Sequence, residues 1–379
     1  MMSQAPAPDA SSSRHDRLVA LLAEDPDNIL LIADAAQAAF EEERYEAAEK
    51  LLERHAGIAP LPPHALHLAG LAAMRRQDWV GAATRFAELV QRGEDAPAIR
   101  FNLAWSLAMA KDFGAALDLL DAQTAGALPQ AAQLRVQLLH DRGAMEEAAG
   151  EARRLFALHP GHRGLAAAVA TLAIDIDDLE LARRAAEAAG DHPDALATFG
   201  TLALGEDHPA EALRLFDAAL ARSPSSPRAL VGRGLVRLLS DDKASAAGDI
   251  DAGAELFGSH LGSWIAAGWA WFLAGDLAAG KARFERALAL DDNFAESHGS
   301  LAVVDVLEGN LESARRRCEV ALRLDRQCFS ASLAATLLSA GAGDADTARQ
   351  IFERALHTPV DAGGRTIAQA LARMGARSG

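Results

Sequence analysis

The stretch LGSWIAAGWAWFLAGDLAAGKARFERALALDD, residues 261–292, holds two helix-forming segments separated by a Gly-Asp break. Its first half carries small and aromatic residues at the i, i+3, i+4 and i+7 spacing of one helix face: Trp264, Ala267, Gly268 and Trp271. After Gly275-Asp276, a second segment carries Gly280, Phe284 and Ala287. Glycines on both segments predict a close contact between two antiparallel helices, with Trp271 and Phe284 filling the space beside it.

The same arrangement recurs along the chain as a turn, an anchor residue, two further residues and a small residue, usually Ala. The anchors are Tyr45, Trp79, Phe113, Met145, Leu179, Pro209, Lys243, Leu277, Leu311 and Ala345. Successive anchors are 34, 34, 32, 34, 30, 34, 34, 34 and 34 residues apart. A fixed period of this length is typical of a helix-turn-helix array, in which each unit packs only on its neighbours.

The unit resembles the tetratricopeptide repeat, whose pattern is Trp-x2-Leu-Gly-x2-Tyr, then Ala-x3-Phe, then Pro. The Ala-x3-large half recurs as Ala48/Leu52, Ala82/Phe86, Ala116/Leu120, Ala212/Phe216, Ala246/Ile250 and Ala348/Phe352. Smaller partners stand at Ala148/Ala152, Ala182/Ala186 and Ala314/Cys318, and closing prolines fall at Pro60, Pro160 and Pro224. The resemblance implies an all-α fold, a right-handed superhelical α-solenoid. The period is too short for HEAT units, and the Thr-Pro-Leu-His turns of ankyrin repeats do not occur.

The repeats predict the organisation of the chain. Residues 1–13 are expected to be a disordered tail, 14–27 an N-terminal capping helix, and 28–190 and 191–360 units one to five and six to ten. Residues 361–379 are expected to form a C-terminal capping helix and tail. Gly190-Asp191-His192-Pro193 ends one helix early, which predicts a hinge or a change of pitch near residue 190.

Composition limits the kinds of partner. The formal charge of −16 opposes binding to nucleic acid, which needs a basic face, and it also disfavours an anionic membrane surface. The longest uncharged apolar run, 261–275, is too short to span a bilayer. Two cysteines, Cys318 and Cys328, make no disulfide framework and favour the cytoplasm. The excess of arginine over lysine suggests a GC-rich bacterial genome.

In the resembled family the first helices of the units line a concave groove that binds proteins. The family frame places these residues there: Phe101, Trp105, Met109, Gln133, Gln137, Val231, Leu235, Ile265, Trp269, Phe272, Val303 and Leu337. The apolar residues either form a trough for an apolar or amphipathic segment of a partner, or are buried by tight curvature. Gln133 and Gln137 either hydrogen-bond the backbone of a bound peptide or are solvated. Trp269 favours the trough, because Trp264 and Trp271 already serve the packing face.

The sequence offers no catalytic or metal-binding motif. Gly275 to Lys281 imitates a phosphate-binding loop, but Ala282 stands where a Ser or Thr must hold Mg²⁺. Asn102 with Arg100 is the sole hint of a carboxylate clamp, and neighbouring units lack its other residues. We therefore expect no enzyme activity, no cofactor and no metal.

The sequence predicts a cytoplasmic, non-enzymatic adaptor or chaperone that binds another protein in its groove. Two alternatives stay open. The chain could be a self-assembling scaffold that forms a homo-oligomer through its apolar last units, or an accessory subunit of an enzyme or secretion complex.

Overall fold

The structure is a computed structural model that describes residues 12–239 and 242–340. It divides into two compact units, residues 1–138 and 139–379, and the boundary falls inside helix α9. The first unit holds α1 (Arg14–Leu22), α2 (Ile29–Glu41), α3 (Tyr45–Ile58), α4 (Pro63–Arg75), α5 (Trp79–Gln91), α6 (Pro97–Met109), α7 (Phe113–Leu119), α8 (Ala122–Ala127) and most of α9 (Pro129–Asp141).

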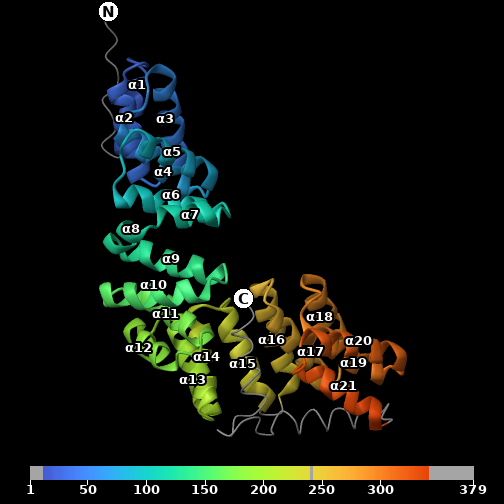
Figure 1. Cartoon of the computed structure of the whole chain (residues 1–379). Coiled ribbons are helices and arrows are strands. Elements are labelled where there is room, and N and C mark those ends of the chain that lie inside the picture. Colours follow the sequence, from blue (N-terminus) through green and yellow to red (C-terminus); the bar gives the residue numbers. More distant parts are fainter. Residues whose placement is uncertain (1–11, 240–241, 341–379) are drawn as a thin grey trace, which may run out of the picture. The chain divides into compact units, whose positions relative to one another are not determined.

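The second unit continues the alternation of helices. It holds α10 (Met145–Leu158), α11 (Arg163–Asp175), α12 (Leu179–Ala189), α13 (Pro193–Gly205), α14 (Pro209–Arg222), α15 (Pro227–Leu239), α16 (Lys243–Phe257), α17 (Leu261–Leu273), α18 (Leu277–Leu290), α19 (Ala295–Leu307), α20 (Leu311–Leu324) and α21 (Phe329–Ala340). Figure 1 shows these helices as successive hairpins, and among the described residues every regular element is a helix. The predicted all-α solenoid is confirmed.

Each of the nine anchors in the described residues is the first residue of the second helix of its hairpin. The tenth, Ala345, lies outside the described residues, as do Ala348/Phe352 and the expected C-terminal cap. A short helix, α1, lies where the N-terminal cap is expected, and Ser13 caps it by accepting a hydrogen bond from the Asp16 amide.

One turn geometry explains why the anchors mark helix starts. Two residues before each of eight anchors, the backbone has positive φ, at Glu43, Gln77, Lys111, Gly143, Asp177, Asp207, Gly275 and Gly309. The next amide then donates to a carbonyl five residues back, for example Asp78 N to Ala73 O at 2.9 Å. This is the Schellman ending of a helix. The side chain of Asp78 then accepts from the Gly81 amide at 3.0 Å and starts the second helix.

Small residues set the distance between the two helices of a hairpin. Phe86, Phe216 and Phe284 are fully buried, and each ring lies against a first-helix glycine: Gly70, Gly200 and Gly268 respectively. A Cβ added at Gly268 would lie 2.3 Å from the Phe284 ring. Cys318 is buried in the core as predicted. The Ala-x3-large positions therefore form the interior of the array.

Both irregular steps of the period have a structural cause. In the third hairpin the second helix breaks at Leu120, and Asp121 caps a separate short helix, α8. Helix α12 has 11 residues where α3 has 14, because it ends at Gly190 with φ +67°. The hinge expected near residue 190 falls inside the second unit, where α11, α12 and α13 pack on one another. Motion at that point stays a prediction.

Candidate functional site

An apolar stripe runs along α6 in the first unit and consists of Phe101, Trp105 and Met109. The opposite side of α6 packs into the core through Leu103 and Ala104. Phe101 and Trp105 are half-buried, and their rings lie 6.1 Å apart between centroids. Met109 is 38% exposed. Among the predicted groove residues, those of the α6 stripe include the aromatic ones whose side chains stay partly accessible to solvent.

Gln133 and Gln137 lie on α9, and both are half-buried. Their spacing of four residues puts them on one side of that helix. Their amide groups are of the type that can pair with a peptide backbone.

The predicted groove residues of the second unit lie in its core. Their exposed fractions are small: Val231 9%, Leu235 7%, Ile265 4%, Trp269 3%, Phe272 4%, Val303 1% and Leu337 0%. Neighbouring first helices pack on one another here, α13 with α15, α17 with α19, and α19 with α21. Curvature within this unit therefore covers groove positions, which is the second of the two alternatives stated for them.

Of the three tryptophans of α17, Trp264 is buried as expected, whereas Trp269 is also buried and Trp271 is only partly so. Trp269 packs in the core, with its ring centroid 5.2 Å from that of Phe284 and 5.4 Å from that of Phe272. Trp271 is half-buried, and the guanidinium of Arg283 lies over its ring, 5.7 Å from the ring centroid. The sequence argument assigned Trp271 to packing and left Trp269 for a ligand. The expectation for Trp269 was wrong because α16, α18 and α19 pack against α17 and bury more than one of its sides.

Val231 and Leu235 border a small cavity of the second unit, about 40 Å³ in volume. Its wall comes from α11, α13, α15 and their neighbours: Ile174, Thr201, Leu204, Phe216, Arg228, Val231, Gly232, Leu235, Phe257 and Ser263. The lining is apolar apart from one guanidinium and two hydroxyls.

A buried carboxylate next to this cavity ties three first helices together. Asp175, at the end of α11, accepts hydrogen bonds from Arg228 of α15 and, at 2.7 Å, contacts Nε2 of His140 at the end of α9. Although burial raises the pKa of the Asp175 carboxyl, Arg228 and His140 outweigh that effect and lower it. Asp175 therefore stays ionised. Through it, His140 holds the C-terminal end of α9, and Arg228 holds the N-terminal end of α15, against the end of α11.

His260, the N-cap residue of α17, lies close to Arg228 and Asp175. Its Nδ1 accepts a hydrogen bond from the Ser263 amide at 3.2 Å, and its ring lies 5.1 Å from that of Phe257. Burial, helped by the charge of Arg228, lowers the pKa of His260 to about 4. The ring is neutral at pH 7, as its role as a hydrogen-bond acceptor requires.

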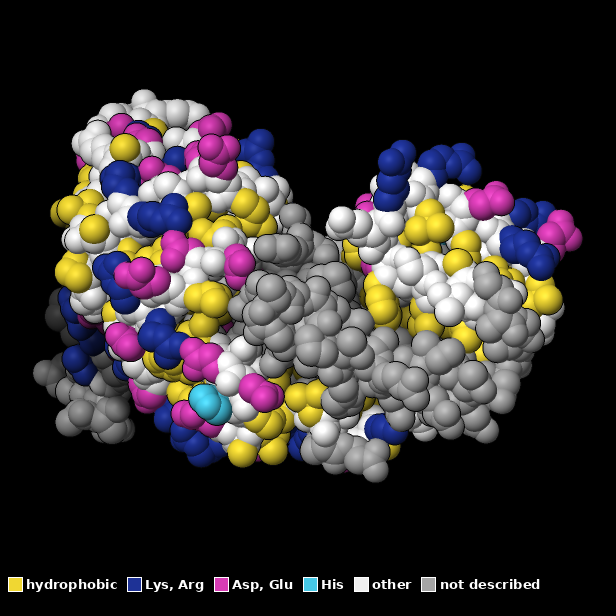
Figure 2. Space-filling model, turned by 60° about the horizontal axis from the view of Figure 1, so that its bottom comes forward, with side chains coloured by type: hydrophobic (Ala, Val, Ile, Leu, Met, Phe, Trp, Pro, Cys, Tyr) yellow, Lys and Arg dark blue, Asp and Glu magenta, His cyan; other side chains and the backbone are white. Residues whose placement is uncertain are grey.

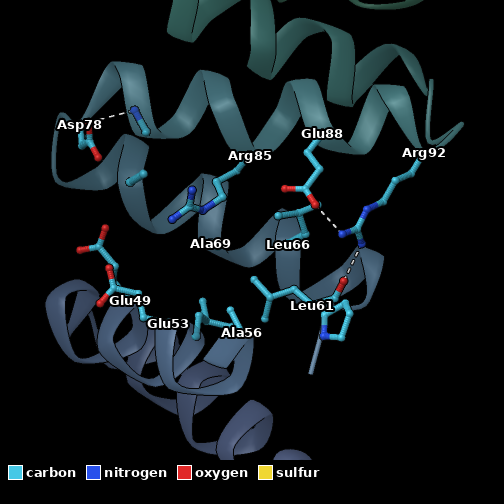
Figure 3. Close-up of a pocket in the computed structure, with 14 residues that line it drawn as sticks. Glu49, Glu53, Ala56, Leu61, Leu66, Ala69, Asp78, Arg85, Glu88 and Arg92 are labelled. Atoms are coloured by element: carbon cyan, nitrogen blue, oxygen red, sulfur yellow. Dashed lines mark hydrogen bonds and ion pairs between the residues drawn. The ribbon is translucent and has the colours of Figure 1, made fainter. Parts of the chain in front are cut away.

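A larger hollow of about 340 Å³ lies between the second helices α3 and α5 of the first unit (Figure 3). Its floor is apolar: Leu52, Leu61, Leu66, Ala69 and Ala73. Its walls carry six charged side chains: Glu49, Glu53, Asp78, Arg85, Glu88 and Arg92. Sequence reasoning missed this hollow, because a period predicts where helices pack and not where side chains fail to fill the space between them.

The two imitations of known sites have structural roles. Arg100, half of the supposed carboxylate clamp, pairs with Asp95 at 3.2 Å and with Asp121 at 2.9 Å. Lys281, the lysine of the supposed phosphate loop, pairs with Glu308 at 2.8 Å. Both cations are already neutralised by carboxylates of the chain.

Comparison with known proteins agrees with the repeat geometry. A family model described as tetratricopeptide repeat matches residues 67–132 and 198–260, one stretch in each unit. Each of the two units contains tetratricopeptide repeats. This family consists of protein-interaction scaffolds and is generally non-enzymatic.

Solved structures align with the chain at low sequence identity, and the first of them shows the same fold. A structure titled as a monomeric mutant of IFIT1 with Gppp-AAAA aligns at a TM-score of 0.54 and 11% identity, over 90% of this tetratricopeptide repeat chain and 93% of that one. The crystal structure of MamA protein aligns at a TM-score of 0.36 and 14% identity, over 44% of this chain and 92% of that one. No curated protein matches the sequence significantly.

Two features of the surface bear on partners. On the face shown in Figure 2, basic, acidic and hydrophobic side chains of the described residues are interspersed. Within residues 12–239 and 242–340, no helix is long and apolar enough to cross a membrane.

Proposed function

We propose that this tetratricopeptide repeat protein is an adaptor or chaperone that binds an apolar or amphipathic segment of another protein, with the α6 stripe as its main contact. The observation that carries the proposal is the exposure of Phe101, Trp105 and Met109 on a helix whose other side is already packed. Aromatic and methionine side chains are enriched at the centres of protein interfaces.

The spacing of the stripe favours a helical or extended segment as the ligand. Residues four apart on a helix form a continuous ridge about two turns long, which matches the apolar side of an amphipathic partner helix. Gln133 and Gln137 on α9 add amide groups of the kind that binds a peptide backbone. A cytoplasmic and bacterial setting belongs to the proposal and rests on composition.

The test compares proteins retained from a lysate of the source organism by the wild type and by Phe101→Ala/Trp105→Ala. Loss of two aromatic contacts should reduce retention of a specific partner by at least about tenfold. Val80→Ala is the control, because Val80 is 69% exposed and belongs to the second helix α5, not to α6. Equal retention by all three proteins, at equal helicity by circular dichroism, would refute the α6 stripe as the binding site.

A further inference from the structure

The hollow between α3 and α5 has two counterparts in the second unit, in each of which an arginine links neighbouring second helices. Helices α10 and α12 begin one hundred residues after α3 and α5, and they line a hollow of about 660 Å³. There Arg153, the counterpart of Glu53, reaches from α10 to Asp178 at the start of α12, with a distance of 2.8 Å. An arginine of the chain thus links the two second helices.

A second counterpart uses the opposite direction. Between α16 and α18, Arg283 reaches back to Asp251, with nitrogen–oxygen distances of 2.9 and 2.6 Å. Asp251 occupies the repeat position of Glu53, and Arg283 occupies that of Arg85. In both places of the second unit, a guanidinium spans the gap between neighbouring second helices and neutralises a carboxylate.

The first unit has no such link. Glu53 and Asp78, which take the places of Arg153 and Asp178, are both acidic. Arg85 points into the hollow from α5, while Glu49 and Glu53 lie on α3 opposite (Figure 3). Among the described residues, no hydrogen bond or ion pair joins Arg85 to any carboxylate.

The charges around the hollow leave an excess of carboxylate. Glu49 pairs with Arg76 and Glu88 pairs with Arg92, which also donates to the carbonyl of Leu61 at 2.6 Å. The other charged groups that line the hollow are Glu53, Asp78 and Arg85, and Lys50, which pairs with Glu46, acts on Glu53 from outside the lining. The hollow therefore lacks one cation, above an apolar floor formed by Leu52, Leu66 and Ala69.

We propose that this hollow is a second interaction site, which takes an arginine or lysine side chain of a partner protein. The apolar stem of that side chain would lie on the floor of the hollow, and its charged head would lie between Glu53 and Asp78, as Arg153 lies against Asp178 in the second unit. The acidic net charge of the chain favours the approach of such a partner. This site is on the second helices and is independent of the α6 stripe.

The probe for this site is a short, fluorescently labelled peptide of leucine, alanine and arginine, compared with a peptide in which glutamate replaces each arginine. Anisotropy titrations should show salt-sensitive binding of the arginine peptide by the wild type and no binding of the glutamate peptide. Glu53→Arg places an arginine at the repeat position that Arg153 holds in the second unit, and it should weaken binding about tenfold. Glu53→Gln/Asp78→Asn should do the same, and it preserves the helix cap because asparagine also caps.

Two controls separate this site from others. Glu46→Arg makes the same charge change on α3, at an exposed residue that does not line the hollow, and should leave binding nearly intact. Trp105→Ala should also bind the arginine peptide normally, so that failure of the α6 stripe and failure of this site are distinguishable. The proposal is overturned if the wild type does not bind the arginine peptide, if the glutamate peptide binds equally well, or if Glu53→Arg and Glu46→Arg have equal effects.

Discussion

At the scale of single residues, the array depends on glycines of the first helices, which leave space for aromatic rings of the second helices. Phe216 touches the positions that a Cβ would take at both Gly200 and Gly232, so one aromatic ring joins two successive first helices. The same ring-on-glycine contact recurs at Phe86 and Phe284. Close packing of this kind leaves no room for even one added methyl group.

Gly268→Ala should destabilise the protein by about 1–3 kcal/mol, because the new Cβ would lie 2.3 Å from the Phe284 ring. The matched control is Gly150→Ala on α10, where no atom lies within 4 Å of the new Cβ. That change should stabilise the protein by about 0.5–1 kcal/mol, since alanine is the better helix former. Urea unfolding followed by circular dichroism measures both. Effects of the same sign would contradict the packing described for the hairpin.

His260 should make stability depend on pH in a defined window. Its pKa in the folded protein is about 4, below its ordinary value of 6.5, so the fold favours the neutral ring. The stabilisation is fully present above pH 6.5 and is lost as the pH falls from 6.5 towards 4, by at most about 3 kcal/mol. His260→Asn keeps a helix cap and cannot titrate, so its free energy of unfolding should fall less over this window. Parallel curves for the two proteins between pH 7 and 4.5 would count against the assignment.

At the scale of the element, the ends of helices carry the polar contacts that fix one hairpin to the next. The pair Asp175–Arg228 links residues 53 positions apart, from the end of α11 to the start of α15. Phe257 lies beside the same guanidinium, at 5.9 Å from its ring centroid. Two first helices that are not neighbours along the array are thus tied across α13.

Asp175→Asn should cost about 3 kcal/mol or more, because it leaves Arg228 without its anionic partner in a largely buried place. Asp191→Asn is the control: it removes an exposed ion pair with Arg163, and such pairs contribute little. Thermal unfolding at pH 7 should therefore separate the two variants clearly. Similar midpoints for Asp175→Asn and the wild type would show that the tie is unimportant.

The elements were the most predictable part of the molecule. The anchor positions correctly predicted the start of the second helix in each described hairpin, because the turn before eight of the nine anchors has the same Schellman geometry. The candidate site was less predictable. The family frame correctly named first-helix positions, but it could not tell Trp105, which is half-buried, from Trp269, which is 3% exposed. That difference depends on how closely neighbouring first helices approach one another, which contacts between distant repeats determine and a 34-residue pattern does not describe.

At the scale of the whole molecule, two units with their own cores share one repeat pattern. Phe86 belongs to a core cluster of the first unit, whereas Phe216 and Phe284 share a cluster in the second. In repeat proteins stability is roughly a sum of unit and nearest-neighbour terms. Damage to one unit should therefore remain local.

Gly268→Ala should accelerate hydrogen exchange in α17 and α18 while leaving α4 and α5 unchanged. Exchange followed by mass spectrometry of peptides from each helix measures this directly. Faster exchange throughout both units would mean that the chain unfolds as one cooperative body, against the division at residue 138.

The central claim is that the α6 stripe binds another protein, and site-specific photocrosslinking in the source organism tests it most directly. A photoreactive phenylalanine at position 101 should form one discrete protein adduct, whereas the same group at Val80 should not. Combining the position 101 label with Trp105→Ala should abolish that adduct. An adduct from position 80 alone, or adducts that ignore Trp105→Ala, would contradict binding along the stripe.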